Sequence, residues 1–234
     1  MKRGGNGMRT QDVTNRIINE IKHKKIITEE ELISLLDKNG IPFILTDEVV
    51  EELISNGIDI VDYQDNDKNI KNSSTVITQR VKSYKKEKEE LLNKTGEEVK
   101  KQFYTDLDKP RIQATYIPLT IIGFLNCSDY EGRVSIDRIV DTYKEFYENR
   151  KNHGLIVERK DSVFSNSTPD DEIIKRLILF NPLGRSFLVK YFTFDRKSEL
   201  VSINHNLWDA LTAADISRIR GISNRLINDY YNKL

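Results

Sequence analysis

One stretch near the C-terminus, Tyr191–Asn204, restricts the folds open to this chain more than any other. It reads YFTFDRKSELVSIN: apolar and polar residues alternate, a charged tip interrupts them, and the alternation resumes. This period of two predicts a β-hairpin with Asp195–Glu199 at its tip. Phe192 and Phe194 share one face of the first strand, so we expect both to pack inward. Nearly all other apolar patterns have helical spacing, so the hairpin belongs to a mainly helical fold.

The elements expected before this hairpin come in the order of a winged helix. An apolar helix begins near Pro118, an extended piece covers 132–136, and a capped helix lies between Ser135 and Gly154. A second helix, Asp171–Phe180, then precedes the hairpin. In a winged helix this second helix reads DNA, and the loop between the last two strands projects as the wing. Residues 110–234 are therefore predicted to form a winged-helix-like domain with a β-hairpin.

Two segments precede this domain. Residues 10–63 hold three capped amphipathic patterns and end in the alternating IDIVDY, which predicts a three-helix module with a short strand. Residues 64–109 begin as a polar linker and lead into a long charged helix, expected near 74–103. The apolar spacing of that helix fits either a connecting helix on the second domain or a homodimer seam. The predicted fold class is mainly α with a minor α+β part.

Residues 27–62 follow a sequence pattern that is more specific than the helical spacing of their apolar residues. Ile27–Leu36 form a hydrophobic-threonine-EEL turn with a helix, Asp47–Ile54 form another helix, and Gly57–Asp62 match a GI-x-I/V-V-D strand. Together they resemble the self-inhibitory N-terminal region of primary bacterial sigma factors. In that family the module is an acidic nucleic-acid mimic that occupies the DNA channel of RNA polymerase until promoter DNA displaces it.

The resemblance implies an interaction domain rather than sigma activity, because the chain has none of the promoter-melting segments of a full sigma factor. Residues 28–62 contain ten acidic residues and one lysine. A basic protein surface would suit them. The residues expected to contact a protein partner are Glu29, Glu30, Asp47, Glu48, Glu51 and Glu52.

Three parts of the second block, 143–165, 178–185 and 203–211 together with 226–231, are similar to C-terminal segments of bacterial restriction and phage-defence proteins. This similarity implies a role in a bacterial defence assembly. It assigns no individual residue a function.

Basic residues of the second block are candidates for nucleic-acid binding. Two clusters, in 142–160 and in the C-terminal helix, interleave them with aromatic residues, which suits phosphate contact and base stacking. The helix Asp171–Phe180 offers two basic residues behind an acidic first turn that repels phosphate, so base reading by this helix is disfavoured. The wing tip has mixed charge, which favours a wing that faces protein. The candidates are Lys144, Arg150, Lys151, Arg159, Lys160, Lys175, Arg176, Arg196, Lys197, Arg218, Arg220 and Arg225.

The sequence offers little for catalysis, and we expect no catalytic residue, metal or cofactor. Its single cysteine, Cys127, excludes an internal disulfide and a Cys-based zinc site. The motif NHN at 204–206 predicts an asparagine cap with a surface histidine rather than an HNH nuclease. One enzymatic alternative stays open, a small metal-dependent nuclease that uses Glu158, Lys160 and Asp170.

These patterns predict a non-enzymatic accessory or regulatory protein of a bacterial assembly that acts on nucleic acid, in transcription or phage defence. We expect it to bind a protein partner and to contact the sugar-phosphate backbone of DNA or RNA. No apolar run reaches the ~18 residues that span a membrane, and the N-terminus lacks the apolar core of a signal peptide. A cytoplasmic protein without a membrane partner is therefore expected.

Overall fold

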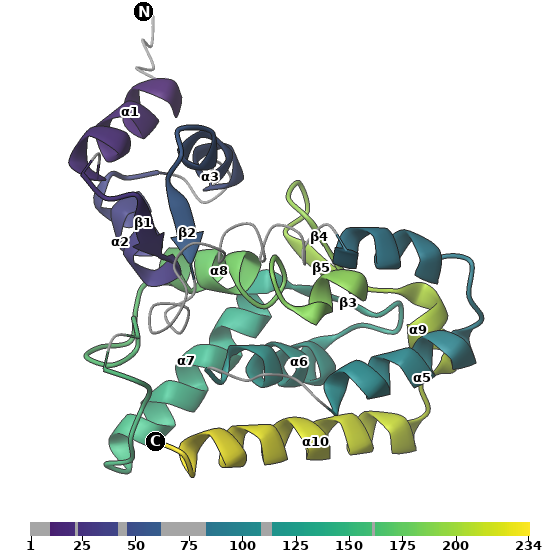
Figure 1. Ribbon diagram of the computed structural model, residues 1–234. Helices are drawn as coiled ribbons and strands as arrows, with labels where there is room; N and C mark the ends of the chain where they lie inside the picture. The colour runs from purple at the N-terminus through teal and green to yellow at the C-terminus, as the bar shows by residue number, and fades with distance from the viewer. Residues whose placement is uncertain (1–9, 22, 42–45, 62–82, 109–113, 161) are drawn as a thin grey trace, which may run out of the picture. The chain divides into compact units, whose positions relative to one another are not determined.

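The computed structural model describes residues 10–21, 23–41, 46–61, 83–108, 114–160 and 162–234. Its contacts divide the chain into two compact units, Met1–Ser74 and Thr75–Leu234. The described residues are mainly helical with a few short strands, so the predicted fold class is confirmed (Figure 1). None of the helices in these ranges is long and apolar enough to cross a membrane.

The described residues of the first unit form three helices and a pair of short parallel strands. Ile27 of β1 lies opposite Ile60 of β2, so the predicted strand has a partner that the sequence pattern did not reveal. Thr28 caps α2 by accepting a hydrogen bond from the Glu31 amide at 3.1 Å, which is the threonine half of the predicted capping box, while the Glu31 carboxylate pairs with Lys24. The elements are α1 (Thr10–Ile21), β1 (Ile26–Thr28), α2 (Glu29–Lys38), α3 (Thr46–Ser55) and β2 (Asp59–Val61).

The second unit has the connectivity expected of a winged helix. Helix, strand, two helices and a hairpin follow one another, and β5 lies between β3 and β4 in an antiparallel sheet. Two further helices close the chain. The elements are the helix of residues 83–91, α5 (Gly96–Leu107), α6 (Tyr116–Cys127), β3 (Arg133–Ser135), α7 (Ile136–Asn152), α8 (Asp171–Phe180), η3 (Phe187–Lys190), β4 (Phe192–Asp195), β5 (Leu200–Ile203), α9 (His205–Ala210) and α10 (Ala213–Tyr231).

The apolar helix α6 forms the centre of this unit and packs against α7 and α10 (Figure 1). The ring of Phe124 meets the rings of Phe192 and Trp208 edge-on, at centroid distances of 5.0 and 5.9 Å. Phe192 therefore packs inward as predicted. Phe194, expected to do the same, is only half-buried.

The helix expected near 74–103 is described from residue 83 onward, where it forms two helices; residues 74–82 lie outside the described ranges. The first ends at Leu91, and α5 begins at Gly96 after a turn. Thr95 causes the break: its hydroxyl and the Glu98 carboxylate form a capping box, with the Thr95 amide donating to Glu98 at 2.9 Å. Three residues of the predicted apolar stripe, Leu91, Val99 and Phe103, are at most 1% exposed and pack in the core, whereas Leu92 of the same stripe is 65% exposed.

The helix of residues 83–91 covers the outer edge of the sheet. The Nζ of Lys88 donates to the backbone oxygen of Phe192 at 2.6 Å and to the Thr193 hydroxyl at 2.7 Å. Close by, the buried Lys190 lies 2.9 Å from Glu87 and 2.7 Å from Asp106. An edge strand whose polar groups are occupied is protected from pairing with other chains.

Candidate interaction surface

The helix in the DNA-reading position, α8, does not present its basic residues to solvent. Lys175 and Arg176 are 8% and 4% exposed. The Nζ of Lys175 lies 2.7 Å from Asp137, at the start of α7, and 3.4 Å from Glu199, the last residue of the wing tip before β5. The predicted contact of these two basic residues with nucleic acid does not fit this arrangement, because both side chains belong to the buried face of α8.

Electrostatics hold Lys175 in this position. Burial by itself would lower the pKa of Lys175, but its hydrogen bond to Asp137 and the charges of Glu199 and Glu172 outweigh burial and raise that pKa. The lysine therefore stays charged and paired at neutral pH. The exposed start of α8 carries Asp171 and Glu172, so the accessible end of the helix is acidic.

The wing tip is small, ordered by its own residues and mixed in charge. The carboxylate of Asp195 accepts hydrogen bonds from the Lys197 amide at 3.1 Å and from the Ser198 hydroxyl at 2.5 Å. These bonds, the one from Ser198 above all, lower the pKa of Asp195. Lys197 is exposed and Arg196 is half-buried.

Two basic–aromatic clusters that are separate in the sequence meet at one end of the second unit. The Arg150 guanidinium of α7 lies 3.3 Å from the centre of the Tyr231 ring, near the end of α10. Its Nε donates to the Ile156 backbone oxygen at 2.7 Å, and the Tyr231 hydroxyl donates to the Val157 oxygen at 2.6 Å. Figure 1 shows the C-terminal end of α10 beside the later part of α7. No sequence signal indicated that the clusters would meet, because about 80 residues separate them.

Exposed aliphatic side chains accompany this cluster. Leu155 and Ile156 are 52% and 56% exposed, and Leu234 is 49% exposed. Exposed Lys151 and Lys233 flank them in the sequence. We call this surface the apolar–basic end; it consists of Phe146, Arg150, Lys151, Leu155, Ile156, Tyr231, Lys233 and Leu234.

The remaining predicted nucleic-acid residues are dispersed, and several have partners within the protein. Lys144 pairs with Asp171 at 2.8 Å, and Arg220 donates to the Leu125 oxygen at 2.8 Å. Arg159 is half-buried. Of the twelve predicted basic residues, those that the structure leaves exposed are Lys151, Lys160, Lys197, Arg218 and Arg225.

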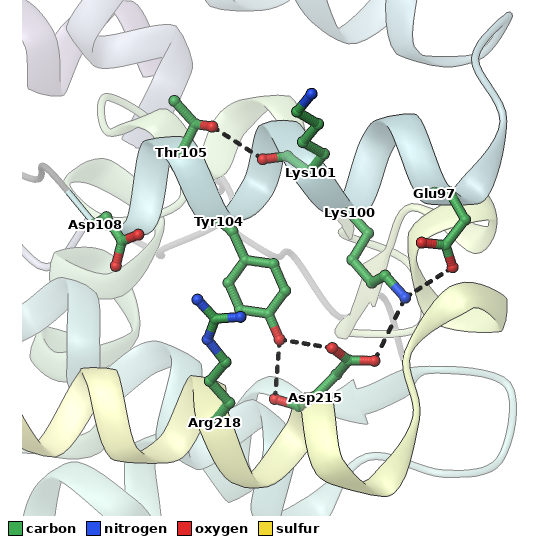
Figure 2. Close-up of a pocket in the computed structure, with 8 residues that line it drawn as sticks. All are labelled: Glu97, Lys100, Lys101, Tyr104, Thr105, Asp108, Asp215 and Arg218. Atoms are coloured by element: carbon green, nitrogen blue, oxygen red, sulfur yellow. Dashed lines mark hydrogen bonds and ion pairs between the residues drawn. The ribbon is translucent and has the colours of Figure 1, made fainter.

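A shallow groove lies between α5 and α10, and the residues that line it connect the two helices (Figure 2). Lys100 lies between Glu97 at 2.7 Å and Asp215 at 3.5 Å. The Tyr104 hydroxyl donates to Asp215 at 2.9 Å, and the Arg218 guanidinium lies 4.5 Å from the Tyr104 ring. Burial and the Asp215 carboxylate raise the pKa of Tyr104 to about 12. The groove is lined by Glu97, Lys100, Lys101, Tyr104, Thr105, Asp108, Asp215 and Arg218.

Glu158, the central residue of the nuclease alternative, lies inside the protein. It is 5% exposed, and one carboxylate oxygen accepts from the Tyr147 hydroxyl at 3.0 Å and from the Thr115 hydroxyl at 3.1 Å. The other oxygen accepts from the Tyr230 hydroxyl. The carboxylate therefore ties the segment after α7 to three helix segments and is closed to a metal or a phosphate. Within the described ranges, no three His, Cys, Asp or Glu side chains are placed to hold a metal ion.

The NHN motif is a helix cap. The Asn204 side chain accepts from the Leu207 amide at 3.0 Å at the start of α9, and His205 is exposed. The predicted asparagine cap with a surface histidine is confirmed.

The acidic residues of the first unit are described only in part. Glu30 and Glu52 are half-buried. The Glu52 backbone oxygen accepts from the side chain of Asn56 at 2.8 Å. The other predicted contact side chains lie outside the part that the structure describes: Glu29, Asp47, Glu48 and Glu51.

No protein-family model, curated protein or solved structure matches this chain. The resemblances to sigma factors and to restriction and phage-defence proteins therefore stay predictions.

Proposed function

We propose that this chain is a non-enzymatic accessory protein that binds a protein partner within a bacterial assembly acting on nucleic acid. The observation that carries the proposal is that the basic side chains of α8 are buried. In a winged helix that reads DNA, this helix offers polar or basic side chains to the base edges. Here its lysine is paired with Asp137 and Glu199, and its exposed first turn is acidic.

Nucleic acid has a minor role in this proposal. The exposed Lys151, Lys197 and Arg218 lie on α7, on the wing and on α10. Basic side chains that are scattered in this way contact phosphates and do not recognise the base sequence. Any binding to DNA or RNA is therefore weak, independent of sequence and strongly reduced by salt.

The sequence resemblances supply the setting. A sigma-like acidic module suits a basic protein surface, and the second unit adds a wing with mixed charge. A transcription or phage-defence assembly in the cytoplasm is the environment in which both would be used.

The test measures binding of the full chain to labelled duplex DNA, single-stranded DNA and RNA by fluorescence anisotropy, at ~50 and ~200 mM salt. We expect weak binding at low salt, equal for unrelated sequences, and little at the higher salt. Lys197→Glu reduces it, whereas Lys175→Met, which changes a buried lysine, does not. Sequence-selective binding that is lost in Lys175→Met would refute the proposal.

A second measurement addresses the partner. The tagged full chain is expressed in its native host, crosslinked and purified, and crosslinked peptides are identified by mass spectrometry. We expect the same protein partner to remain after nuclease treatment. A bound fraction that disappears with nuclease would indicate association through nucleic acid alone.

A further inference from the structure

We propose that the apolar–basic end binds an acidic amphipathic helix of a partner protein. The inference rests on the proposed function, because it names the chemistry of the protein partner and the surface of the second unit that receives it.

Aliphatic exposure is the first observation. Among the described residues, the large hydrophobic side chains with the greatest exposure include Leu155, Ile156 and Leu234. Leu155 and Ile156 are consecutive, and the Ile156 backbone is bonded to Arg150, which stacks on Tyr231, the last residue of α10 and three residues before Leu234. Clustered exposed apolar side chains rimmed by polar residues mark interaction sites, whereas isolated ones do not.

Charge complementarity selects the occupant. Lys151 and Lys233 are exposed and have no ion-pair partner among the residues that the structure describes. The nearest carboxylate in the loop, Glu158, is buried and occupied by hydroxyl groups. Exposed Glu148 and Asp229 are the acidic residues closest in sequence. With Arg150, three basic residues face these two carboxylates, and an apolar surface with this excess of positive charge fits a helix whose apolar stripe is flanked by Asp and Glu.

Hydrogen bonds within the protein fix the backbone conformation of the apolar–basic end in the absence of a partner. The Leu155 amide donates to the Arg150 backbone oxygen at 2.9 Å, and Gly154 adopts a φ of +64° that closes α7. The Tyr231 hydroxyl fixes the next turn of chain through Val157. A rigid receptor loses little conformational entropy on binding.

The same geometry disfavours single-stranded nucleic acid. Base stacking needs an open aromatic face, but the Arg150 guanidinium lies against the ring of Tyr231. The exposed apolar side chains of this surface are leucine and isoleucine, which have no aromatic face for a base to stack on. A protein helix therefore fits this surface better than an oligonucleotide does.

The experiment uses the full chain and a labelled peptide of about four helical turns, with leucines at spacings of three and four residues and flanking glutamates. Fluorescence anisotropy measures its affinity. A peptide of the same composition in scrambled order and one with lysine in place of glutamate serve as controls. We expect binding of the acidic amphipathic peptide alone.

Matched variants locate the site. Ile156→Asp weakens peptide binding by about tenfold or more, since it removes an apolar anchor and adds a like charge. Lys151→Glu weakens it and reduces its salt dependence. Leu92→Asp changes a leucine that is 65% exposed in the turn before α5, so peptide affinity should not change. Circular dichroism confirms that each variant, altered at an exposed position, remains folded.

Three results would overturn the inference: no binding of the acidic peptide, equal loss in Leu92→Asp and Ile156→Asp, or stronger binding of an oligonucleotide or an anionic vesicle through Ile156. Absence of peptide binding together with weak, sequence-independent DNA binding rejects this inference and leaves the proposed function standing. Sequence-selective DNA binding through α8 rejects the proposed function itself.

Discussion

Replacement of Glu158 by glutamine tests whether this buried carboxylate is a structural anchor. The substitution preserves side-chain volume and removes the charge. A glutamine oxygen can still accept from the Thr115 and Tyr147 hydroxyls. The amide nitrogen, however, replaces the oxygen that accepts from Tyr230 and from the Arg159 amide at 3.2 Å.

The expected decrease in the free energy of unfolding follows from these hydrogen bonds. Hydrogen bonds to a charged acceptor contribute about 1.5–3 kcal/mol each, against about 1 kcal/mol for neutral pairs. The bonds from Thr115 and Tyr147 weaken, and the bonds from the Tyr230 hydroxyl and the Arg159 amide are lost in their present form, which lowers the free energy of unfolding by about 3 kcal/mol. For a unit of this size, about 1 kcal/mol corresponds to about 2–4 °C, so the melting temperature falls by about 6–12 °C.

The assay is urea unfolding at neutral pH, followed by the fluorescence of Trp208. This is the chain's single tryptophan and lies in the second unit, so its signal reports the unit that contains Glu158. Glu148→Gln is the matched control, since Glu148 is exposed on α7 and its substitution should change stability by less than about 0.5 kcal/mol. Tyr147→Phe removes one partner and should cost about 1–2 kcal/mol.

An unchanged or higher unfolding midpoint in Glu158→Gln would refute this reasoning. Such a result would mean that the desolvation of the buried carboxylate outweighs its hydrogen bonds. A double-mutant cycle with Tyr147→Phe separates the two cases, because direct partners show a coupling free energy of about 0.5–3 kcal/mol.

Two further predictions concern stability. Gly96→Ala places a Cβ 2.5 Å from the Asn206 backbone oxygen and 2.8 Å from the Ala210 Cβ, so overpacking should lower the free energy of unfolding by about 1–3 kcal/mol. The added Cβ of Gly221→Ala meets nothing within 4 Å, so this variant should raise the free energy of unfolding. Equal urea midpoints for the two variants would contradict this. Burial raises the pKa of Tyr104 to about 12, above the unfolded value of about 10, so its contribution is complete below pH ~10 and is lost as pH rises. Urea unfolding across alkaline pH checks this; stability that stays constant there would contradict it.

Local order in this chain could be predicted from the sequence. The threonine cap at Thr28, the asparagine cap at Asn204 and the hairpin of Tyr191–Asn204 all occur as expected. Each depends on contacts between residues that are close in the chain, so a short pattern contains the information. The same logic also identified the winged-helix order. A capping box at Thr95, not predicted from the sequence, is the reason that one expected helix is two.

The candidate sites depended on longer-range contacts, and there the sequence was a poor guide. Lys175 and Arg176 have the composition of a DNA-contacting pair, yet the rotation of α8 on the core decides that they are buried. Glu158 has the spacing of a nuclease motif, but hydroxyl groups from other helices enclose it.

The sequence by itself determined a mainly helical protein, its capped elements and the hairpin, because these follow from periodicity and from hydrogen bonds within a few residues. Only the tertiary structure decided which charges reach solvent. Packing placed Arg150 of α7 against Tyr231 of α10 and left Leu155 and Ile156 exposed beside them. Residues so far apart in the chain meet only when the core has formed, so no local pattern could have shown that surface.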